Sequence, residues 1–487
     1  MMGKPRAGAR LPETKLPLYR NTLDWDWFSQ QFPAPDVWAE TIFKWPADRV
    51  RELQNRRFLA MMAVGWDNAF YRERWAAAGL EPGDINSLDD ITKLPAFNSD
   101  DIKDDQREHP PFGRFSGVEL HRELQSNPIK MQTSGGTTGK PRPTLFGVLE
   151  WEMNALQVAR TLYIQGARPG DVMLIPATNS LANLAWCYYK AAHDYLGMMP
   201  LTTGSGVVTP SLKQIELAFD YGVNVIMSFP EYLTQLAKVA REEHGRDARD
   251  LGLKFIPTYL GPDTGGVLRR ELEALYDTRV YDNYGTHEVS NAAFEGEDQD
   301  GLYLMEDCIY LEVVDVETGL PVEPGETGNL VATSLFRKIP PIIRFNLRDL
   351  TRILPQRPSA LGTHFRRMDH FLGRSDDMVK LRGTNLYPMG CLNAVRSDPR
   401  TTGEWMCIVE RHVRNEVIRD EMTVQVEVRR QAGGREGLQE VLEQRLHTDL
   451  GVRVAVELVE EGALADVANL GREGKPRRLV DRRFTKD

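Results

Sequence analysis

The sequence is poor in cysteine and has no long apolar segment. Its 487 residues include four isolated cysteines, Cys187, Cys308, Cys391 and Cys407, so neither a disulfide framework nor a cysteine zinc site is indicated. Nowhere do eighteen or more apolar residues run together, and the basic first twenty residues contain no apolar stretch. Neither a membrane span nor a secretory signal is predicted, and we expect a cytoplasmic protein.

An excess of positive charge is also lacking. The formal net charge is −10, which argues against a dedicated nucleic-acid-binding protein, although the final GKPRRLVDRRFTKD is locally basic. A hydrophobic fraction of 41% and a charged fraction of 27% are those of an ordinary globular protein. A chain of this length is expected to divide into domains. Neither a nucleic acid nor a membrane is an expected partner.

One short segment, TSGGTTGKPRP at residues 133–143, is rich in glycine, hydroxyl groups and positive charge. Glycines let backbone N–H groups approach a ligand closely, and Lys140 and Arg142 add positive charge. A phosphate chain is therefore the expected ligand. The Walker A signature is absent, because Ser134 stands near the place of its first glycine and Pro141 replaces its Ser or Thr. Taken alone, the segment fits a surface turn equally well.

The pattern along the chain predicts an α/β protein. Up to about residue 127, apolar residues recur at helical spacing, which predicts a mostly helical cover. From Asp171, the apolar runs DVMLIPA, VNVIMSF and FIPTYL alternate with helical segments. This alternation predicts a parallel, doubly wound sheet that binds ligands at the carboxyl ends of its strands. From Ile309, two strands joined by a Gly/Pro-rich turn predict a small β region.

The end of the chain changes character again. Residues 404–413, 422–430 and 452–460 are typical of strands, and residues 435–450 are typical of a helix. This order predicts a separate small α+β domain. We therefore expect two domains, 1–374 and 375–487, with the helical cover at 1–127 of the first.

Two further segments carry groups suited to a nucleotide. VYDNYGTHEVS, residues 280–290, combines an aromatic ring that can stack on a purine with Glu288, a carboxylate that can hold Mg²⁺ against phosphate oxygens. In IIRFNLRDLTRIL, Asp349 follows an apolar strand, where a carboxylate can accept both hydroxyls of a ribose. The alternative for Asp349 is a turn residue that satisfies local backbone groups.

These segments, in this order, resemble the adenylate-forming superfamily and, within it, the phenylacetate–coenzyme A ligase family. The resemblance spans nearly the whole chain and rests on five ordered motifs: SGGTTGKP, YDNYGTHE, RFNLRDLT, GRSDDMVKLRGTNLYP and EGKPRRLVDRR. It implies a large N-terminal adenylate-forming domain with doubly wound sheets plus a small β region, and a small mobile α+β C-terminal domain.

The resemblance implies a two-step reaction with ATP and Mg²⁺. A carboxylic acid attacks the α-phosphorus of ATP to give an acyl adenylate and pyrophosphate, and a thiol, here coenzyme A, then displaces AMP. Family analogy implies that this small-molecule acid is aromatic, either aryl or aryl-alkenoic. Family members are often dimers, so a homodimer is possible.

The resemblance also assigns roles to residues that bind ATP. The loop from Ser134 to Lys140 is expected to hold the leaving phosphates. Tyr284 is expected to stack on adenine, Asp282 to accept from its exocyclic amine, and Gly261 to form part of the adenine wall, while Asp349 with Arg374 grips the ribose. The full predicted set is Ser134, Gly135, Gly136, Thr137, Thr138, Gly139, Lys140, Gly261, Asp282, Tyr284, Asp349 and Arg374.

Further roles concern catalysis and domain motion. Lys475 is implied to enter the site from the small domain and to stabilise charge on the reacting phosphate and carboxylate, a role that suits a mobile ammonium. Glu288 is implied to bind Mg²⁺. The small domain is implied to turn about the hinge Asp376 and to bring the thiolation loop around Gly383 towards the thiol channel.

The acyl pocket is assigned to the segment ATNSLANLAWCYYKAAHDYLG. Asn183, Trp186 and Tyr189 are its candidate lining residues, although large aromatic side chains are more often part of a core. Nearer the hinge, His364 and His370 with Asp369 match no zinc signature, and surface or capping roles are expected for them.

Two departures from the family pattern leave alternatives open. Gly135 replaces a common Ser or Thr, and His287 replaces the Ser or Thr before the magnesium glutamate. The imidazole could contact the carboxylate, act as a base, or simply replace a hydroxyl as a neutral donor. One alternative is therefore adenylation with another acceptor or substrate: a carrier protein, an amine, or nitrite activated to diazotise an aryl amine. A second is a non-catalytic nucleotide-binding homologue.

Overall fold

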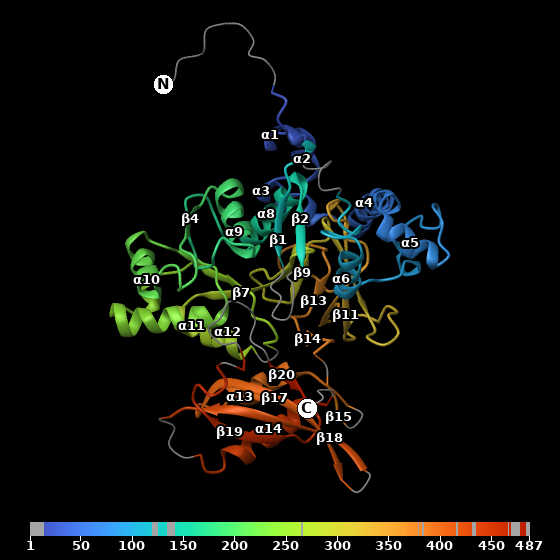
Figure 1. Ribbon diagram of the computed structural model, residues 1–487. Helices are drawn as coiled ribbons and strands as arrows, with labels where there is room; N and C mark the ends of the chain where they lie inside the picture. The colour runs from blue at the N-terminus through green and yellow to red at the C-terminus, as the bar shows by residue number, and fades with distance from the viewer. Residues whose placement is uncertain are drawn as a thin grey trace.

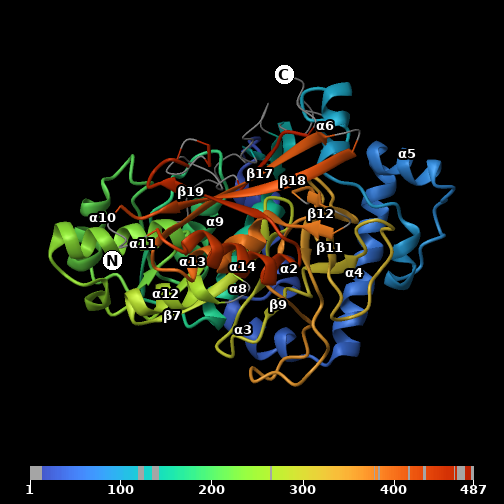
Figure 2. The same cartoon turned by 90° about the horizontal axis from the view of Figure 1, so that it is seen from below.

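The computed structural model describes residues 14–118, 125–133, 142–263, 266–377, 379–381, 384–414, 417–430, 435–465, 467–468 and 478–483. A large N-terminal part carries most of the helices and sheets, and a smaller C-terminal part lies below it in Figure 1. The same two parts are seen from below in Figure 2, where the C-terminal part lies in front.

The first hundred or so residues of the described chain are helical. Aromatic side chains from these helices, among them Trp38, Phe43 and Phe70, pack into one core with strand residues such as Phe294. The elements are α1 (Tyr19–Thr22), α2 (Trp25–Gln31), α3 (Pro35–Glu40), η1 (Ile42–Lys44), α4 (Ala47–Asp67), α5 (Ala69–Ala77), η2 (Leu88–Lys93) and α6 (Ser99–Glu108).

The central sheet is mixed, with strand order β13-β9-β8-β7-β6-β5-β3-β4. Its strands from β7 to β4 in this order are mutually parallel, and β8, β9 and β13 continue it antiparallel. The bounds are β3 (Val172–Ile175), β4 (Met199–Thr202), β5 (Val225–Ile226), β6 (Phe255–Thr258), β7 (Arg279–Thr286), β8 (Ser290–Phe294), β9 (Leu302–Leu304) and β13 (Arg367–Met368). The predicted parallel arrangement is confirmed, and the antiparallel extension adds to it.

Helices cover both faces of the parallel strands. Successive strand residues point to opposite faces, so Leu174 packs in one core with α10, α11 and α12, while Met173 and Ile175 pack in another with α8 and α9. This is the doubly wound arrangement expected from the sequence. The helices are α8 (Val148–Ile164), α9 (Leu184–Lys190), η3 (Ala191–Tyr195), α10 (Ser211–Asp220), α11 (Pro230–Val239), η4 (Ala240–His244), η5 (Ala248–Leu251) and α12 (Val267–Tyr276).

Two smaller sheets complete the N-terminal part. The hairpin of β1 (Lys130–Thr133) and β2 (Pro143–Phe146) is antiparallel. The second sheet has the order β10-β11-β12-β14 and consists of β10 (Ile309–Val314), β11 (Gly328–Ser334), β12 (Phe345–Thr351) and β14 (Gly373–Arg374). It contains the small β region that was expected from Ile309.

The C-terminal part has its own hydrophobic core, in which Trp405 and Cys407 pack against Leu442 and Leu446. Its main sheet has the order β19-β18-β17-β20. The elements are β15 (Val379–Leu381), β16 (Thr384–Leu386), η6 (Pro388–Cys391), α13 (Leu392–Arg396), β17 (Thr401–Arg414), β18 (Val417–Val428), α14 (Leu438–Leu450), β19 (Ala455–Glu460) and β20 (Leu479–Asp481). A separate α+β C-terminal domain is thus confirmed, while its exact boundary at 374/375 stays a prediction.

Candidate active site

The β1–β2 hairpin carries the predicted phosphate loop. Thr133 pairs with Pro143 across the hairpin, and the Thr133 amide donates to the Leu181 carbonyl at 3.0 Å. The loop therefore begins beside the segment that follows β3, at the carboxyl edge of the parallel sheet. Residues 134–141, and with them the predicted contacts from Ser134 to Lys140, lie outside the described residues.

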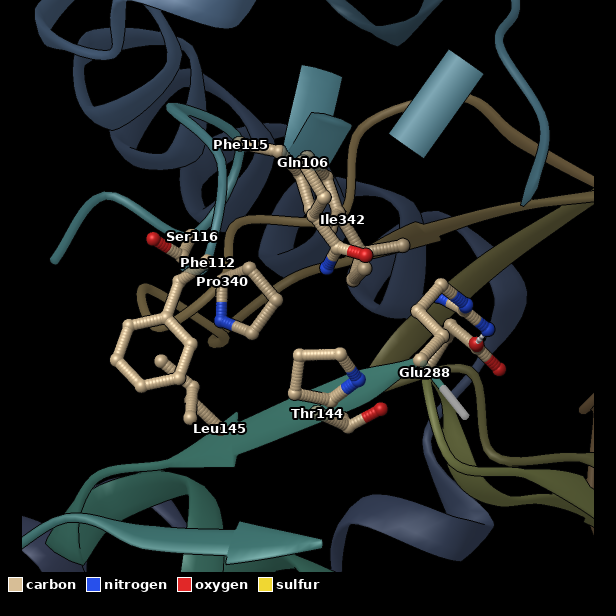
Figure 3. A pocket seen from close by; sticks show the side chains of 11 residues that line it. Gln106, Phe112, Phe115, Ser116, Thr144, Leu145, Glu288, Pro340 and Ile342 are labelled. Atoms are coloured by element: carbon tan, nitrogen blue, oxygen red, sulfur yellow. Dashed lines mark hydrogen bonds and ion pairs between the residues drawn. The ribbon is translucent and has the colours of Figure 1, made fainter. Parts of the chain in front are cut away.

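Arg142, at the end of this hairpin loop, pairs with Glu288 in the turn between β7 and β8. Burial by itself would raise the pKa of Glu288, but the charge of Arg142, with the hydrogen bonds from Arg142 and Thr286, outweighs it and lowers this pKa to about 2. The carboxylate is therefore ionised. Figure 3 shows Glu288 beside Thr144 at a small cavity of about 10 Å³, which is close to the space of one water molecule.

Glu288 fits a magnesium ligand by its charge and by its place opposite the phosphate hairpin. Mg²⁺ usually binds through one or two carboxylates and substrate phosphates rather than through an all-protein cage. In the described part of the chain, no group of three or more His, Cys, Asp and Glu residues is arranged to hold a metal. A metal bound here would share the Glu288 carboxylate with Arg142 or displace it.

His287 lies beside Glu288 and is half-buried. Burial lowers its pKa, and the nearby charges of Arg142 and Arg337 lower it further against the opposing effect of Glu288. The ring is therefore neutral at neutral pH. Its Nδ1 is buried and has no hydrogen-bond partner among the described atoms, so one ring nitrogen is unsatisfied within the described residues.

Tyr284, Asp349 and Arg374 come together at the predicted ribose position. Asp349 on β12 lies directly opposite Arg374 on β14, and the Arg374 Nη1 donates to Asp349 Oδ1 at 3.0 Å. The Tyr284 hydroxyl donates to the other oxygen, Oδ2, at 2.6 Å. Burial and the Asp349 charge hold the pKa of Tyr284 well above its usual range, so the phenol stays protonated as a donor.

Gly261 and Asp282 are the residues predicted to contact adenine. Gly261 follows β6 with φ +70°, a conformation that favours glycine. The amide of Leu260 donates to Asp282 Oδ1 at 2.8 Å, so the loop after β6 is fastened to β7. Both residues lie at the carboxyl ends of parallel strands, where the sequence predicted a ligand site.

The three acyl-pocket candidates contact different neighbours. Asn183 is buried and exchanges side-chain hydrogen bonds of 2.9 and 3.0 Å with Asn154. Tyr189 stacks on His193. The face of Trp186 is covered by a cation, described next.

Lys130 of β1 lies between two tryptophan rings. Its Nζ is 3.7 Å from the centroid of Trp151 and 3.8 Å from that of Trp186, and burial lowers its pKa to about 8. A cavity of about 390 Å³ lies on the Trp151 side and is also lined by Tyr19 and Phe146. The sequence did not single out Lys130, since its two aromatic partners come from separate helices.

The predicted hinge residue Asp376 is tied to the ribose position. Both its carboxylate oxygens accept hydrogen bonds of 2.7 Å from Arg374, and Arg348 Nη1 lies 3.7 Å from Asp376 Oδ2. Arg374 therefore bridges Asp349 and the hinge. Gly383 and Lys475 lie outside the described residues.

One expectation near the hinge was wrong. His370 was predicted to have a surface or capping role, but its side chain is only 23% exposed and its Nδ1 lies 2.8 Å from Asp282 Oδ2. No local pattern reveals this contact, because the partner is 88 positions away. His364 is exposed.

Comparison with known proteins bears on this arrangement. Residues 82–335 match the family described as AMP-binding enzyme, and residues 383–483 match the AMP-binding enzyme C-terminal domain. Phenylacetate-coenzyme A ligase from Aromatoleum evansii is 31% identical over 91% of this chain and 97% of that protein. The ligase of the same name from Pseudomonas putida is 30% identical over 90% of this chain and 95% of that protein. The chain belongs to the AMP-binding enzyme family.

This AMP-binding enzyme is thus a member of the AMP-forming acid–thiol ligases and is similar to phenylacetate–coenzyme A ligases. It is also similar to a solved structure, 2-hydroxyisobutyryl-CoA ligase in the postadenylation state in complex with R3-HIB-AMP, with 28% identity, a TM-score of 0.78, and coverage of 90% of this chain and 91% of that chain. Against the same ligase with 2-HIB-AMP and CoA in the thioesterification state, the TM-score is 0.65 at 29% identity, with 91% of each chain covered. As a whole, the chain is therefore more similar to the postadenylation structure than to the thioesterification structure.

In the described part of the AMP-binding enzyme, no helix is both long and apolar enough to cross a membrane.

Proposed function

We propose that this AMP-forming acid–coenzyme A ligase activates an aromatic carboxylic acid as its acyl adenylate and transfers the acyl group to coenzyme A. The observation that carries the proposal is the set of Tyr284, Asp349 and Arg374, in which the tyrosine hydroxyl and the guanidinium both donate to the Asp349 carboxylate, as suits the predicted ribose position. The similarity to phenylacetate-coenzyme A ligases over most of the chain supports an aromatic acid.

In the first half-reaction, a carboxylate oxygen of the acid bonds to the α-phosphorus of ATP and the bond to the β-phosphate oxygen breaks. Residues 134–140 hold the leaving pyrophosphate, and Asp349 with Arg374 holds the ribose. Glu288 is the residue that would hold Mg²⁺, which neutralises phosphate charge when bound. Lys475 stabilises the charge that develops on the reacting groups.

In the second half-reaction, the coenzyme A sulfur bonds to the acyl carbon and AMP leaves. The residues 375–487 act as the mobile domain, which turns about Asp376 and exchanges Lys475 for the loop around Gly383. Arg374 contacts both Asp349 and Asp376, so the ribose position and the hinge are mechanically linked. A homodimer, a carrier-protein partner and a cytoplasmic location stay predictions.

A different acceptor or substrate is the second candidate, and His287 favours it. Its neutral ring has an Nδ1 without a partner among the described atoms, so it can accept a proton from an amine or contact a small anion such as nitrite. In that case adenylation would be kept and coenzyme A would be replaced.

The deciding experiment measures pyrophosphate release from ATP and Mg²⁺ over a panel of aryl acids. Each acid is tested with and without coenzyme A, and nitrite is tested with an aryl amine. We expect acid-dependent release that coenzyme A accelerates, with a thioester detected by mass. Release that needs nitrite, or that coenzyme A does not change, would instead support the second candidate. The absence of pyrophosphate release in every arm of the experiment would contradict the ligase proposal for aryl acids.

Lys475→Ala separates the two half-reactions. We expect it to reduce pyrophosphate release by about a hundredfold or more, since a positioned charge at the reacting phosphate is lost. Thioester formation from a preformed acyl adenylate should stay within about threefold of the unaltered chain, because Lys475 has left the site in that step. Equal loss in both half-reactions would contradict the assigned role.

A further inference from the structure

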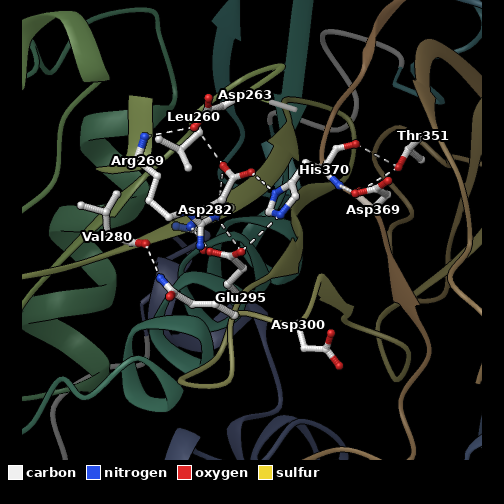
Figure 4. A network of polar contacts seen from close by, with 12 residues as sticks. Leu260, Asp263, Arg269, Val280, Asp282, Glu295, Asp300, Thr351, Asp369 and His370 are labelled. Atoms are coloured by element: carbon white, nitrogen blue, oxygen red, sulfur yellow. Dashed lines mark hydrogen bonds and ion pairs between the residues drawn. The ribbon is translucent and has the colours of Figure 1, made fainter. Parts of the chain in front are cut away.

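His370 lies between the two halves of the nucleoside position. Its backbone is fixed from the ribose side, because the Thr351 hydroxyl on β12 donates to the carbonyls of Asp369 at 2.8 Å and His370 at 3.2 Å. Thr351 is two positions from Asp349 on the same strand. Figure 4 shows the imidazole reaching from this anchored backbone towards Asp282.

Both ring nitrogens of His370 face carboxylates. Nδ1 lies 2.8 Å from Asp282 Oδ2, and Nε2 lies 3.4 Å from Glu295 Oε1. An ionised carboxylate only accepts hydrogen bonds, and a neutral imidazole has a single N–H. The imidazolium is therefore the form that satisfies both contacts. Asp282 and Glu295 are buried, so solvent contributes little to stabilising their charges and nearby cations must take that role.

The charged surroundings favour the same form. Glu295 also pairs with Arg269 Nη2 at 2.7 Å and accepts the Asp282 amide at 2.7 Å. On the residue before His370, Asp369 pairs with Arg352 at 2.9 Å. Without the imidazolium, two buried carboxylates would share the one cation of Arg269, and such uncompensated burial is costly.

Asp282 retains room for one more donor. Its Oδ1 accepts from the amides of Leu260 at 2.8 Å and Asn283 at 3.0 Å, and its Oδ2 faces His370. A carboxylate offers about four lone-pair directions. Among the described residues, His370 is the one hydrogen-bond partner of Oδ2, so a lone-pair direction on this oxygen is left there, and an ionised carboxylate accepts in that direction but cannot donate.

We propose that His370 is a positioning residue for purine recognition, whose imidazolium orients the Asp282 carboxylate as an acceptor for the exocyclic amine of adenine. The inference rests on the proposed placement of adenine at Asp282. An acceptor at this place matches the amine of adenine and opposes the C6 carbonyl of guanine. His370 therefore supports both the affinity for adenine nucleotides and their selection over guanine nucleotides.

This role makes nucleotide binding depend on pH. Burial by itself would lower the pKa of His370, but the hydrogen bond and charge of Asp282, with the charge of Glu295, outweigh it and the opposing charge of Arg269, so this pKa is raised. A raised pKa means that the cation is fully present below the ordinary value of about 6.5. It is lost as the pH rises through the raised value, so adenine binding weakens on the alkaline side.

The test compares three variants of the full-length chain by calorimetric titration with AMP and GMP between pH 6 and 9. His370→Gln keeps a hydrogen-bond donor without the positive charge, and His370→Lys keeps a positive charge. His364→Gln is the control, because it makes the same substitution at an exposed histidine between β12 and β14. AMP binding needs neither an acid nor coenzyme A, so this test can fail while the proposed ligase reaction stands, and the reverse also holds.

We expect His370→Gln to raise the Kd for AMP by about tenfold, the range of one hydrogen bond to a charged group. The preference for AMP over GMP should fall with it, and the alkaline weakening should disappear. His370→Lys should recover most of the affinity, and His364→Gln should match the unaltered chain. Equal affinity, selectivity and pH dependence in His370→Gln and His364→Gln would overturn the proposal.

A second measurement is made on the unaltered chain and needs only one of the two His370 variants to fold. The imidazole of His370 is assigned in the NMR spectrum of the unaltered chain by its absence from His370→Gln or His370→Lys, whichever folds, and is then titrated. Titration above the ordinary range, with a chemical-shift change on AMP addition, supports the proposal. Titration below that range, or a signal that AMP does not affect, contradicts it.

Discussion

At the scale of single residues, the site depends on buried carboxylates whose two oxygens have different partners. Asp349 holds Tyr284 on one oxygen and Arg374 on the other. Charge-assisted hydrogen bonds of this kind are the strong ones, and they set the direction of the remaining lone pairs. The orientation of the Asp349 carboxylate, the predicted ribose acceptor, therefore depends on a phenol that the sequence assigned only to stacking.

Tyr284→Phe separates that hydrogen bond from the aromatic ring. We expect the Kd for AMP to rise by about tenfold, because a hydrogen bond to a charged group contributes about 1.5–3 kcal/mol and the ring is kept. Calorimetric titration with AMP measures the change. Tyr221→Phe, at a tyrosine that is 57% exposed, should leave the Kd unchanged. An unaltered Kd in Tyr284→Phe would mean that the hydroxyl does not orient Asp349 for the nucleotide.

At the scale of elements, the turn between β7 and β8 places the magnesium candidate. Gly285 pairs with Asn291 where the register of the two strands shifts, and Ser290 has φ +59°. A side chain at Gly285 would collide with the backbone oxygen of Ser290. The close approach of these strands therefore holds Glu288 in reach of the phosphate hairpin.

Gly285→Ala should force the two strands apart. We expect a loss of about 1–3 kcal/mol in the free energy of unfolding, the usual cost of an added group in a filled site. Pyrophosphate release should fall at the same time as Glu288 moves. Denaturant unfolding and the ATP reaction give the two readouts. Gly319→Ala, at a turn with φ +68° and open space around it, should lose about 1–2 kcal/mol from backbone strain with normal activity. Full activity in Gly285→Ala would contradict this account of the turn.

At the scale of the whole molecule, two parts with separate cores are joined next to Arg374, a residue of the predicted nucleotide site. The arrangement is more similar to a postadenylation structure than to a thioesterification structure of the same ligase. Arg374 connects Asp349 in the large part to Asp376 at the start of the small one. A rotation about Asp376 therefore changes a contact made by a ribose-binding candidate.

Asp376→Pro tests the rotation, because proline fixes φ near −65° and restricts the residue before it. We expect thioester formation to fall by at least about tenfold relative to pyrophosphate release, since hinge residues must absorb a large dihedral change. Asp376→Ala is the matched control, because it loses the same carboxylate but keeps the dihedral freedom. Parallel losses of both half-reactions in the two variants would argue against a hinge at this residue.

Much of the fold follows from local patterns in the sequence. The apolar runs at β3, β5 and β6 alternate with helical segments, which predicts a parallel sheet covered by helices. The parallel pairing of these strands confirms the prediction. The strand–strand–helix–strand order of the C-terminal part was also predicted from the sequence, because each element has its own periodicity. The β1–β2 hairpin and the antiparallel strands beyond β7 were not predicted, because the pairing of strands depends on distant segments of the chain.

Three local features could be recognised from the amino-acid sequence: a glycine-rich predicted phosphate loop, Glu288 after a strand, and Asp349 in a second motif, in an order that identifies the family. These features are local: each can be recognised from a few consecutive residues, without knowledge of the tertiary structure. Only the tertiary structure decided their partners, such as Arg142 for Glu288 and His370 for Asp282. The physical reason is that a carboxylate's charge state and free lone pairs depend on burial and on neighbours from remote parts of the chain.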